Sequence, residues 1–140
     1  ALRFPSVSAL PQHAADMRAT AEWLAERLRA LGVPEVALLE GGGHPLVFGR
    51  WDAHPGAPAA MVYGHYDVQP PDPLDLWVTG PFEPTVRAGF LYARGAADNK
   101  GNVVAVLQAV EALVQTGGGA PPVNLVFFFE GEEEIGSPTV

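Results

Sequence analysis

Apolar residues recur every three or four positions in two segments of the chain, and this spacing predicts two helices. The first covers about residues 14–31 and ends at Gly32 and Pro34. Its apolar stripe consists of Met17, Ala21, Leu24, Leu28 and Leu31. The second ends before the glycines at 117–119. Its apolar stripe consists of Val103, Val106, Leu107, Val110, Leu113 and Val114.

Four other segments have the composition of β-strands and are bounded by turns rich in glycine and proline. They are residues 36–39, 46–51, 59–64 and 123–129. The last is an almost continuous apolar run, which is typical of a strand covered on both faces. A hairpin is expected around Ala88-Gly89, joining residues 85–87 to 90–93. The order strand, loop, helix, strand predicts an α/β fold with helices packed on a sheet.

Composition and charge narrow the class of protein. Apolar residues make up 48% of the 140 residues and charged residues 17%, which indicates a globular chain. The net charge of -8 argues against nucleic acid or an anionic membrane as a partner. Without cysteine, any metal must be bound by His, Asp and Glu. No apolar run approaches the ~20 residues of a membrane span and no signal peptide is visible, so a cytoplasmic location is expected.

Two candidate sites contain an imidazole or a carboxylate beside a predicted element. His65 and Asp67 follow the strand at 59–64. A neutral imidazole is a good zinc ligand and a nearby carboxylate can fix its tautomer, but a structural histidine also fits this pattern. Asp98 precedes the second helix, where it is either a metal ligand or an N-cap that accepts backbone N–H bonds.

A third candidate site is the acidic run at 130–134, which follows the apolar strand at 123–129. Such a run is often a solvated loop, yet crowded carboxylates also repel one another unless a cation is bound. Ligand sites in α/β sheets gather at the carboxyl ends of strands. The three sites together therefore indicate a metallohydrolase, with one His, a shared Asp and a Glu for a pair of metals and a second Glu to activate water.

Four motifs then match a known family in order along the chain. They are Tyr-Gly-His-Tyr-Asp-Val-Gln-Pro at 63–70, Leu-Trp-x-x-x-Pro-Phe-Glu-Pro at 76–84, Leu-Tyr-Ala-Arg-Gly-Ala-Ala-Asp-Asn-Lys-Gly at 91–101 and Glu-Gly-Glu-Glu-Glu-Ile-Gly-Ser at 130–137. The sequence resembles the co-catalytic zinc metallopeptidases, which include carnosinase-type dipeptidases, acetylornithine deacetylase and succinyl-diaminopimelate desuccinylase. The resemblance runs from about Phe4 to the last residue and implies a three-layer αβα zinc-exopeptidase-like fold.

Carried over residue by residue, the resemblance implies a role for each candidate. His65 would bind one zinc ion, Glu134 the other, and Asp98 would bridge both. Asp67 would orient His65, and Glu133 would be the general base. Glu130 and Glu132 would have no role, and the Asp98–Asn99 peptide bond is expected to be cis.

The implied activity is hydrolysis of the amide bond of dipeptides by a zinc-activated water. The Val-Gln-Pro and Trp…Pro-Phe stretches favour the dipeptidase branch, and an N-acyl-amino-acid deacylase is the alternative. Two Zn²⁺ ions are expected, with Mn²⁺ or Co²⁺ able to substitute. The expected substrate is a small peptide and the expected assembly a homodimer.

Members of the resembled family are much longer chains. Their further Asp and His ligands and a smaller dimerisation and lid domain lie downstream of the residues matched here. Residues 1–140 are therefore expected to be an N-terminal part of the catalytic domain, trimmed at its start as well. By itself this chain is expected to have incomplete metal sites and to be inactive.

Overall fold

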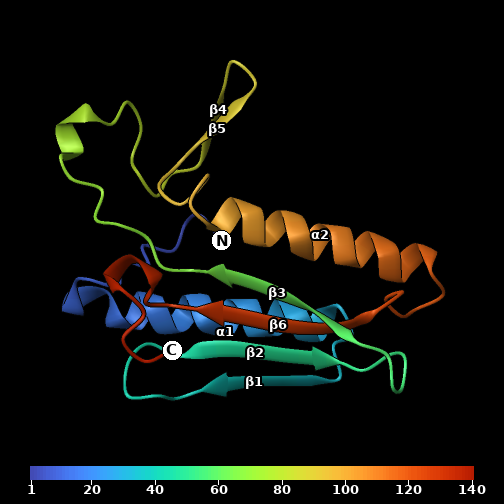
Figure 1. Ribbon diagram of the computed structural model, residues 1–140. Helices are drawn as coiled ribbons and strands as arrows, with labels where there is room; N and C mark the ends of the chain where they lie inside the picture. Colours follow the sequence, from blue (N-terminus) through green and yellow to red (C-terminus); the bar gives the residue numbers. More distant parts are fainter.

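The computed structural model describes residues 1–140 and contains the two expected helices (Figure 1). Helix α1 spans Ala14–Ala30 and follows a 3₁₀ turn, η1 (Pro11–His13). Helix α2 spans Lys100–Thr116 and begins a few residues before its apolar stripe. Neither helix is long and apolar enough to cross a membrane.

The strands form one four-stranded sheet and one hairpin. The sheet has the order β1-β2-β6-β3, and its strands are β1 (Glu35–Leu39), β2 (Leu46–Trp51), β3 (Ala59–His65) and β6 (Asn124–Glu130). Strand β2 is antiparallel to β1 and β6, whereas β3 and β6 are parallel. Strands β4 (Thr85–Arg87) and β5 (Phe90–Tyr92) make the expected hairpin, which projects away from the sheet (Figure 1).

The parallel pairing of β3 and β6 positions the candidate site. In this register His65 lies opposite Glu130, so both strands end at the same edge of the sheet. Shortly after the end of β6 the chain enters another 3₁₀ turn, η3 (Glu133–Ile135). Residues from both acidic and imidazole motifs are therefore brought together by the sheet, as expected for ligand sites in α/β folds.

One face of the sheet carries the hydrophobic core. The register pairs Val47 with Phe129 and Gly49 with Phe127, and an added Cβ at Gly49 would meet the side chains of Phe127 and of Leu28 on α1, so these positions share one face. The apolar stripes of α1 and α2 pack here in a single cluster with β2 and β6. Phe127 and Phe129 are completely buried, and burial of each such side chain stabilises the fold by about 1.5–3 kcal/mol.

The opposite face of the sheet is more open. Met61 and Tyr63 of β3 are 66% and 54% exposed, and Val126 and Phe128 of β6 are half-buried. Of the three expected layers, residues 1–140 supply the sheet and one helical layer. The sequence predicted that β6 is covered on both faces, but both helices of this chain pack on the same face of the sheet and leave the other face of β6 more open.

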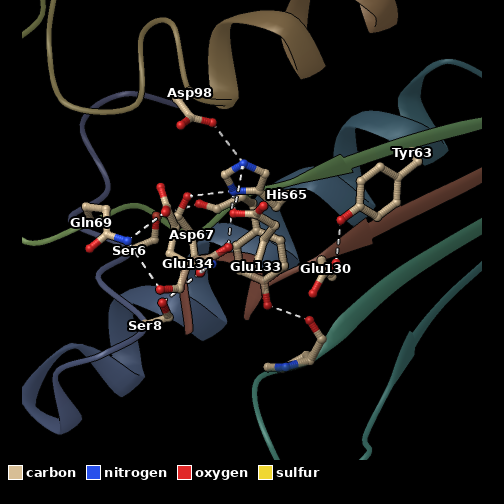
Figure 2. A network of polar contacts seen from close by, with 12 residues as sticks. Ser6, Ser8, Tyr63, His65, Asp67, Gln69, Asp98, Glu130, Glu133 and Glu134 are labelled. Carbon is tan, nitrogen blue, oxygen red and sulfur yellow. Dashed lines mark hydrogen bonds and ion pairs between the residues drawn. The ribbon is translucent and has the colours of Figure 1, made fainter. Parts of the chain in front are cut away.

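A glycine in β3 sets the distance between the sheet and α2. A Cβ atom at Gly64 would lie 2.7 Å from Cγ2 of Val103 on α2, which is closer than side chains pack. Glycine therefore lets the first turn of α2 approach the end of β3. This approach brings the loop that carries Asp98 over the end of β3 (Figure 2).

Candidate active site

His65 lies at the centre of the candidate site, at the end of β3 (Figure 2). Its side chain is buried. Its Nδ1 atom is 3.2 Å from the backbone oxygen of Asp67 and 3.3 Å from Oδ1 of the same residue. Its Nε2 atom is 3.0 Å from Oδ1 of Asp98 and 3.7 Å from Oε2 of Glu133. Acceptor oxygens therefore face both ring nitrogens.

Three of the candidate residues form a group that could hold a metal ion. One ligand atom each from His65, Glu133 and Glu134 lies within 4.8 Å of the other two. The histidine comes from the end of β3 and both glutamates from the η3 turn after β6. Asp98 is outside this group of three and adjoins it through its contact with His65.

Asp98 does not cap α2. The N-cap position is occupied by Asn99, and no side chain makes a capping hydrogen bond there. The Asp98 carboxylate points instead towards the imidazole of His65 (Figure 2) and is otherwise largely exposed. The capping interpretation of this residue is therefore wrong. The Asp98–Asn99 peptide bond is cis, as the resemblance predicted.

Asp67 is a completely buried carboxylate that connects the two strand ends. Its Oδ2 atom accepts hydrogen bonds from Oγ of Ser8, at 2.7 Å, and from the backbone N–H of Glu134, at 3.0 Å. Burial works to raise the pKa of Asp67, but the hydrogen bonds from His65, Ser8 and Glu134 outweigh it and hold this pKa below its ordinary value. Asp67 therefore remains an anion beside the imidazole.

The acidic surroundings also act on His65. Burial disfavours the imidazolium ion, but the contacts with Asp67 and Asp98 and the charge of Glu133 raise the pKa of His65 to about 9. The same negative charge that makes His65 hold its proton more tightly would also attract a divalent cation. Imidazole and carboxylate groups are ligands that zinc and similar ions prefer, so the residues present fit a metal centre.

Sequence reasoning missed two polar residues that touch the site. Ser8 donates to Asp67, and Gln69 donates through Nε2 to Oε2 of Glu134, at 2.8 Å, and to its backbone oxygen, at 3.2 Å. The alternation of Ser6 and Ser8 was a usable signal, since alternate side chains of an extended segment face the same side. Nothing in the local sequence indicates which carboxylate they meet.

Glu130 and Glu132, which the resemblance left without a role, are buried and make contacts of their own. Glu130 accepts a hydrogen bond of 2.5 Å from the hydroxyl of Tyr63. Glu132 accepts from the backbone N–H of His44, at 3.0 Å, and from the backbone and hydroxyl of Thr139. Two of the four carboxylates of the acidic run are therefore buried and not solvated, and they connect separate segments of the chain.

Comparison with known proteins identifies the family. The family model described as peptidase family M20/M25/M40 matches residues 61–140, which include most of β3, all of α2 and β6, and the acidic run. The chain belongs to this family. Membership implies divalent metal ions, in agreement with the ligand types that meet at His65.

Relatives in this family include dipeptidases and a desuccinylase. A Cys-Gly metallodipeptidase of Candida albicans is 38% identical, over 98% of this chain and 31% of its own length. A succinyl-diaminopimelate desuccinylase of Xanthomonas euvesicatoria is 45% identical, over 65% of this chain and 23% of its own length. The structure of human carnosine dipeptidase 1 superposes with a TM-score of 0.90 and 33% identity, over 99% of this chain and 31% of that one. The chain thus spans less than a third of the length of these relatives.

Proposed function

We propose that the full-length protein hydrolyses the amide bond of dipeptides with the help of two divalent metal ions, zinc in the first place. The observation that carries this proposal is the convergence of one ligand atom each from His65, Glu133 and Glu134 within 4.8 Å of one another, with Asp98 at Nε2 of His65. The similarity to dipeptidases over nearly the whole of this chain supports a small peptide as substrate.

Three residues are proposed as metal ligands. His65 would hold one ion through Nε2, Glu134 the other, and Asp98 both. Asp67 would orient the imidazole, since its carboxylate and its backbone oxygen both face Nδ1. Such a contact fixes the tautomer that leaves the Nε2 lone pair free for a metal.

Glu133 is proposed as the general base. Its carboxylate lies 3.7 Å from His65 and so adjoins the ligands. It would take a proton from the attacking water and return it to the leaving amine. The metal ions, when bound, supply a lowered pKa for that water and compensation for the charge that develops on the carbonyl oxygen.

The test is a substrate panel on the full-length protein loaded with Zn²⁺, Mn²⁺ or Co²⁺. We expect hydrolysis of unmodified dipeptides and loss of turnover after chelation, with recovery when metal is returned. A panel in which no dipeptide is cleaved by the metal-loaded protein would refute the proposal.

The second candidate function is N-acyl-amino-acid deacylation. It is favoured by the 45% identity to the Xanthomonas desuccinylase, which is comparable to the identity with dipeptidases. Succinyl- and acetyl-amino acids in the same panel distinguish the two candidates, because a deacylase would prefer them to free dipeptides.

Two further expectations belong to the whole protein. We propose that it forms a homodimer, which size-exclusion chromatography with light scattering would test. We also propose that residues 1–140 alone have no turnover, since relatives about three times as long carry out the reaction. The cytoplasmic location stays a prediction from the sequence.

A further inference from the structure

The segment before α1 lies against the candidate active site although it is distant in sequence. Val7 forms a parallel β-bridge with Val68, and the backbone N–H of Val68 donates to the oxygen of Ser6 at 2.9 Å. The Ser6 hydroxyl donates to the backbone oxygen of Tyr66 at 2.7 Å. Residues 6–8 therefore run beside residues 66–68, which carry Asp67.

Further polar contacts hold the segment in place on both sides of this β-bridge. The buried ammonium group of Lys100, at the start of α2, donates to the backbone oxygen of Phe4 at 2.8 Å. A ring nitrogen of His44 lies 3.1 Å from the backbone oxygen of Ser8. Ser6 and Val7 are completely buried, and Ser8 is nearly so. The position of the Ser8 hydroxyl is thus defined by contacts to three separate parts of the fold.

The Ser8 hydroxyl meets the one carboxylate that connects the predicted metal ligands. Oδ2 of Asp67 accepts from Ser8 at 2.7 Å and from the Glu134 backbone at 3.0 Å, while Oδ1 faces Nδ1 of His65 (Figure 2). Oδ1 is buried and accepts no hydrogen bond, and Nδ1 of His65 lies 3.3 Å from it. The rotation of the carboxylate therefore decides both the alignment with His65 and the contact with Glu134.

We infer that Ser8 is a positioning residue of the metal centre, whose hydroxyl fixes the rotation of the Asp67 carboxylate and thereby orients His65 and the backbone of Glu134. The inference rests on the proposed function. Without the hydroxyl, a buried anion loses a charge-assisted hydrogen bond, the kind that is stronger and more directional than a neutral one. The carboxylate is then held on Oδ2 by a single backbone donor.

Ser6 provides the matched control. It lies in the same segment and is completely buried, and its hydroxyl also makes one hydrogen bond of 2.7 Å. That bond goes to a backbone oxygen instead of a carboxylate. The Ser6→Ala variant should therefore also lose stability, while the rotation of Asp67 remains fixed by Ser8.

The test measures Zn²⁺ binding by the full-length protein in competition with a chromophoric chelator, at a temperature where every variant is folded by circular dichroism. We expect Ser8→Ala to weaken zinc binding by about 10–100-fold, the usual cost of losing a contact that orients a ligand. Ser6→Ala should leave zinc affinity close to wild type. With Co²⁺ as probe, only Ser8→Ala should shift the visible absorption spectrum.

The pair Ser8→Thr and Ser8→Val keeps the test decisive if Ser8→Ala fails to fold. The two side chains have the same shape and only threonine carries a hydroxyl, so threonine should bind zinc more tightly than valine. Equal zinc affinities in this pair, or equal losses of zinc affinity in Ser8→Ala and Ser6→Ala, would overturn the role of Ser8.

These measurements use no peptide substrate, so they test the role of Ser8 separately from the proposed function. A wild-type protein that binds zinc without cleaving dipeptides would refute the proposed function alone, and one that binds no zinc would refute both.

Discussion

Oδ1 of Asp98 lies 3.0 Å from Nε2 of His65, although the two residues are 33 positions apart and belong to different elements. The contact exists because α2 begins where β3 ends, at a distance that Gly64 permits. An imidazole nitrogen between carboxylates from a loop and from the η3 turn is an arrangement that a cation would stabilise.

The first prediction concerns Asp98 itself. The Asp98→Asn substitution keeps the size of the side chain but removes the charge proposed to serve both metals. Zinc affinity of the full-length protein should fall by more than about 100-fold, because even contacts that merely orient a ligand cost 10–100-fold when lost. Titration with Zn²⁺ against a chelator measures the change. Asp52→Asn is the control, since Asp52 pairs with Arg50 on the surface. An equal effect in both variants would contradict the assignment.

The second prediction separates the proposed base from the proposed ligands. Glu133→Gln should reduce kcat by about 10²–10⁴-fold, the usual contribution of a general base, with metal content unchanged. Steady-state kinetics on a dipeptide and metal analysis of the same sample provide the two readouts. Glu134→Gln should instead reduce the metal content. If Glu133→Gln lost metal and Glu134→Gln kept it, the two roles would have to be exchanged.

The third prediction is a dependence of stability on pH in metal-free protein. The pKa of His65 is about 9 in the folded chain, compared with an ordinary value of 6.5. Between these values the folded state binds more protons than the unfolded state, so the free energy of unfolding should fall as pH rises from 6.5 to 9. Below pH 6.5 the contribution of His65 should be fully present.

Urea unfolding in the presence of chelator, at a series of pH values, measures this dependence. The difference between wild type and His65→Asn isolates the contribution of His65 from those of other titrating groups. That difference should shrink as pH rises through the window. A difference that stays constant between pH 6.5 and 9 would show that the acidic neighbours do not act on the imidazole.

The fourth prediction concerns the turn between β6 and η3. A methyl group added at Gly131 would overlap with the ring of Tyr66, which is buried and donates a hydrogen bond to the backbone oxygen of Pro45. Gly131→Ala should therefore destabilise the fold by about 1–3 kcal/mol, as overpacked cores do. Gly41→Ala is the control, because the added Cβ would meet Thr139 at an ordinary 3.5 Å. Urea denaturation of both variants tests the prediction, and equal stabilities would contradict it.

Hydrophobic periodicity predicted the two helices to within a few residues, because their buried and exposed faces differ in polarity. The strands were predicted equally well from their composition and from the glycine- and proline-rich turns between them. The end of β3 at His65 and the end of β6 before the acidic run followed from the same patterns. The direction of the Asp98 side chain could not be predicted from the sequence, since an aspartate before a helix is equally suited to capping. The contact of Ser8 with Asp67 also escaped prediction, because it depends on how two distant extended segments lie side by side.

The different roles of the four glutamates in the acidic run could not be predicted from the sequence either. In the fold, Glu130 and Glu132 are buried and accept hydrogen bonds from other segments. Glu133 and Glu134 instead lie near His65. The separation depends on Tyr63 from the neighbouring strand and on Thr139 from the end of the chain. Neither partner is adjacent in sequence to the residue that it contacts.

Strand β3 is the edge of the sheet, and Met61 and Tyr63 on it are exposed. One row of its backbone N–H and C=O groups is therefore free to pair with a further strand. A strand that paired there in parallel would end at the same edge of the sheet as β3 and β6. The residues that follow such a strand would therefore lie at the edge that carries His65 and the candidate site.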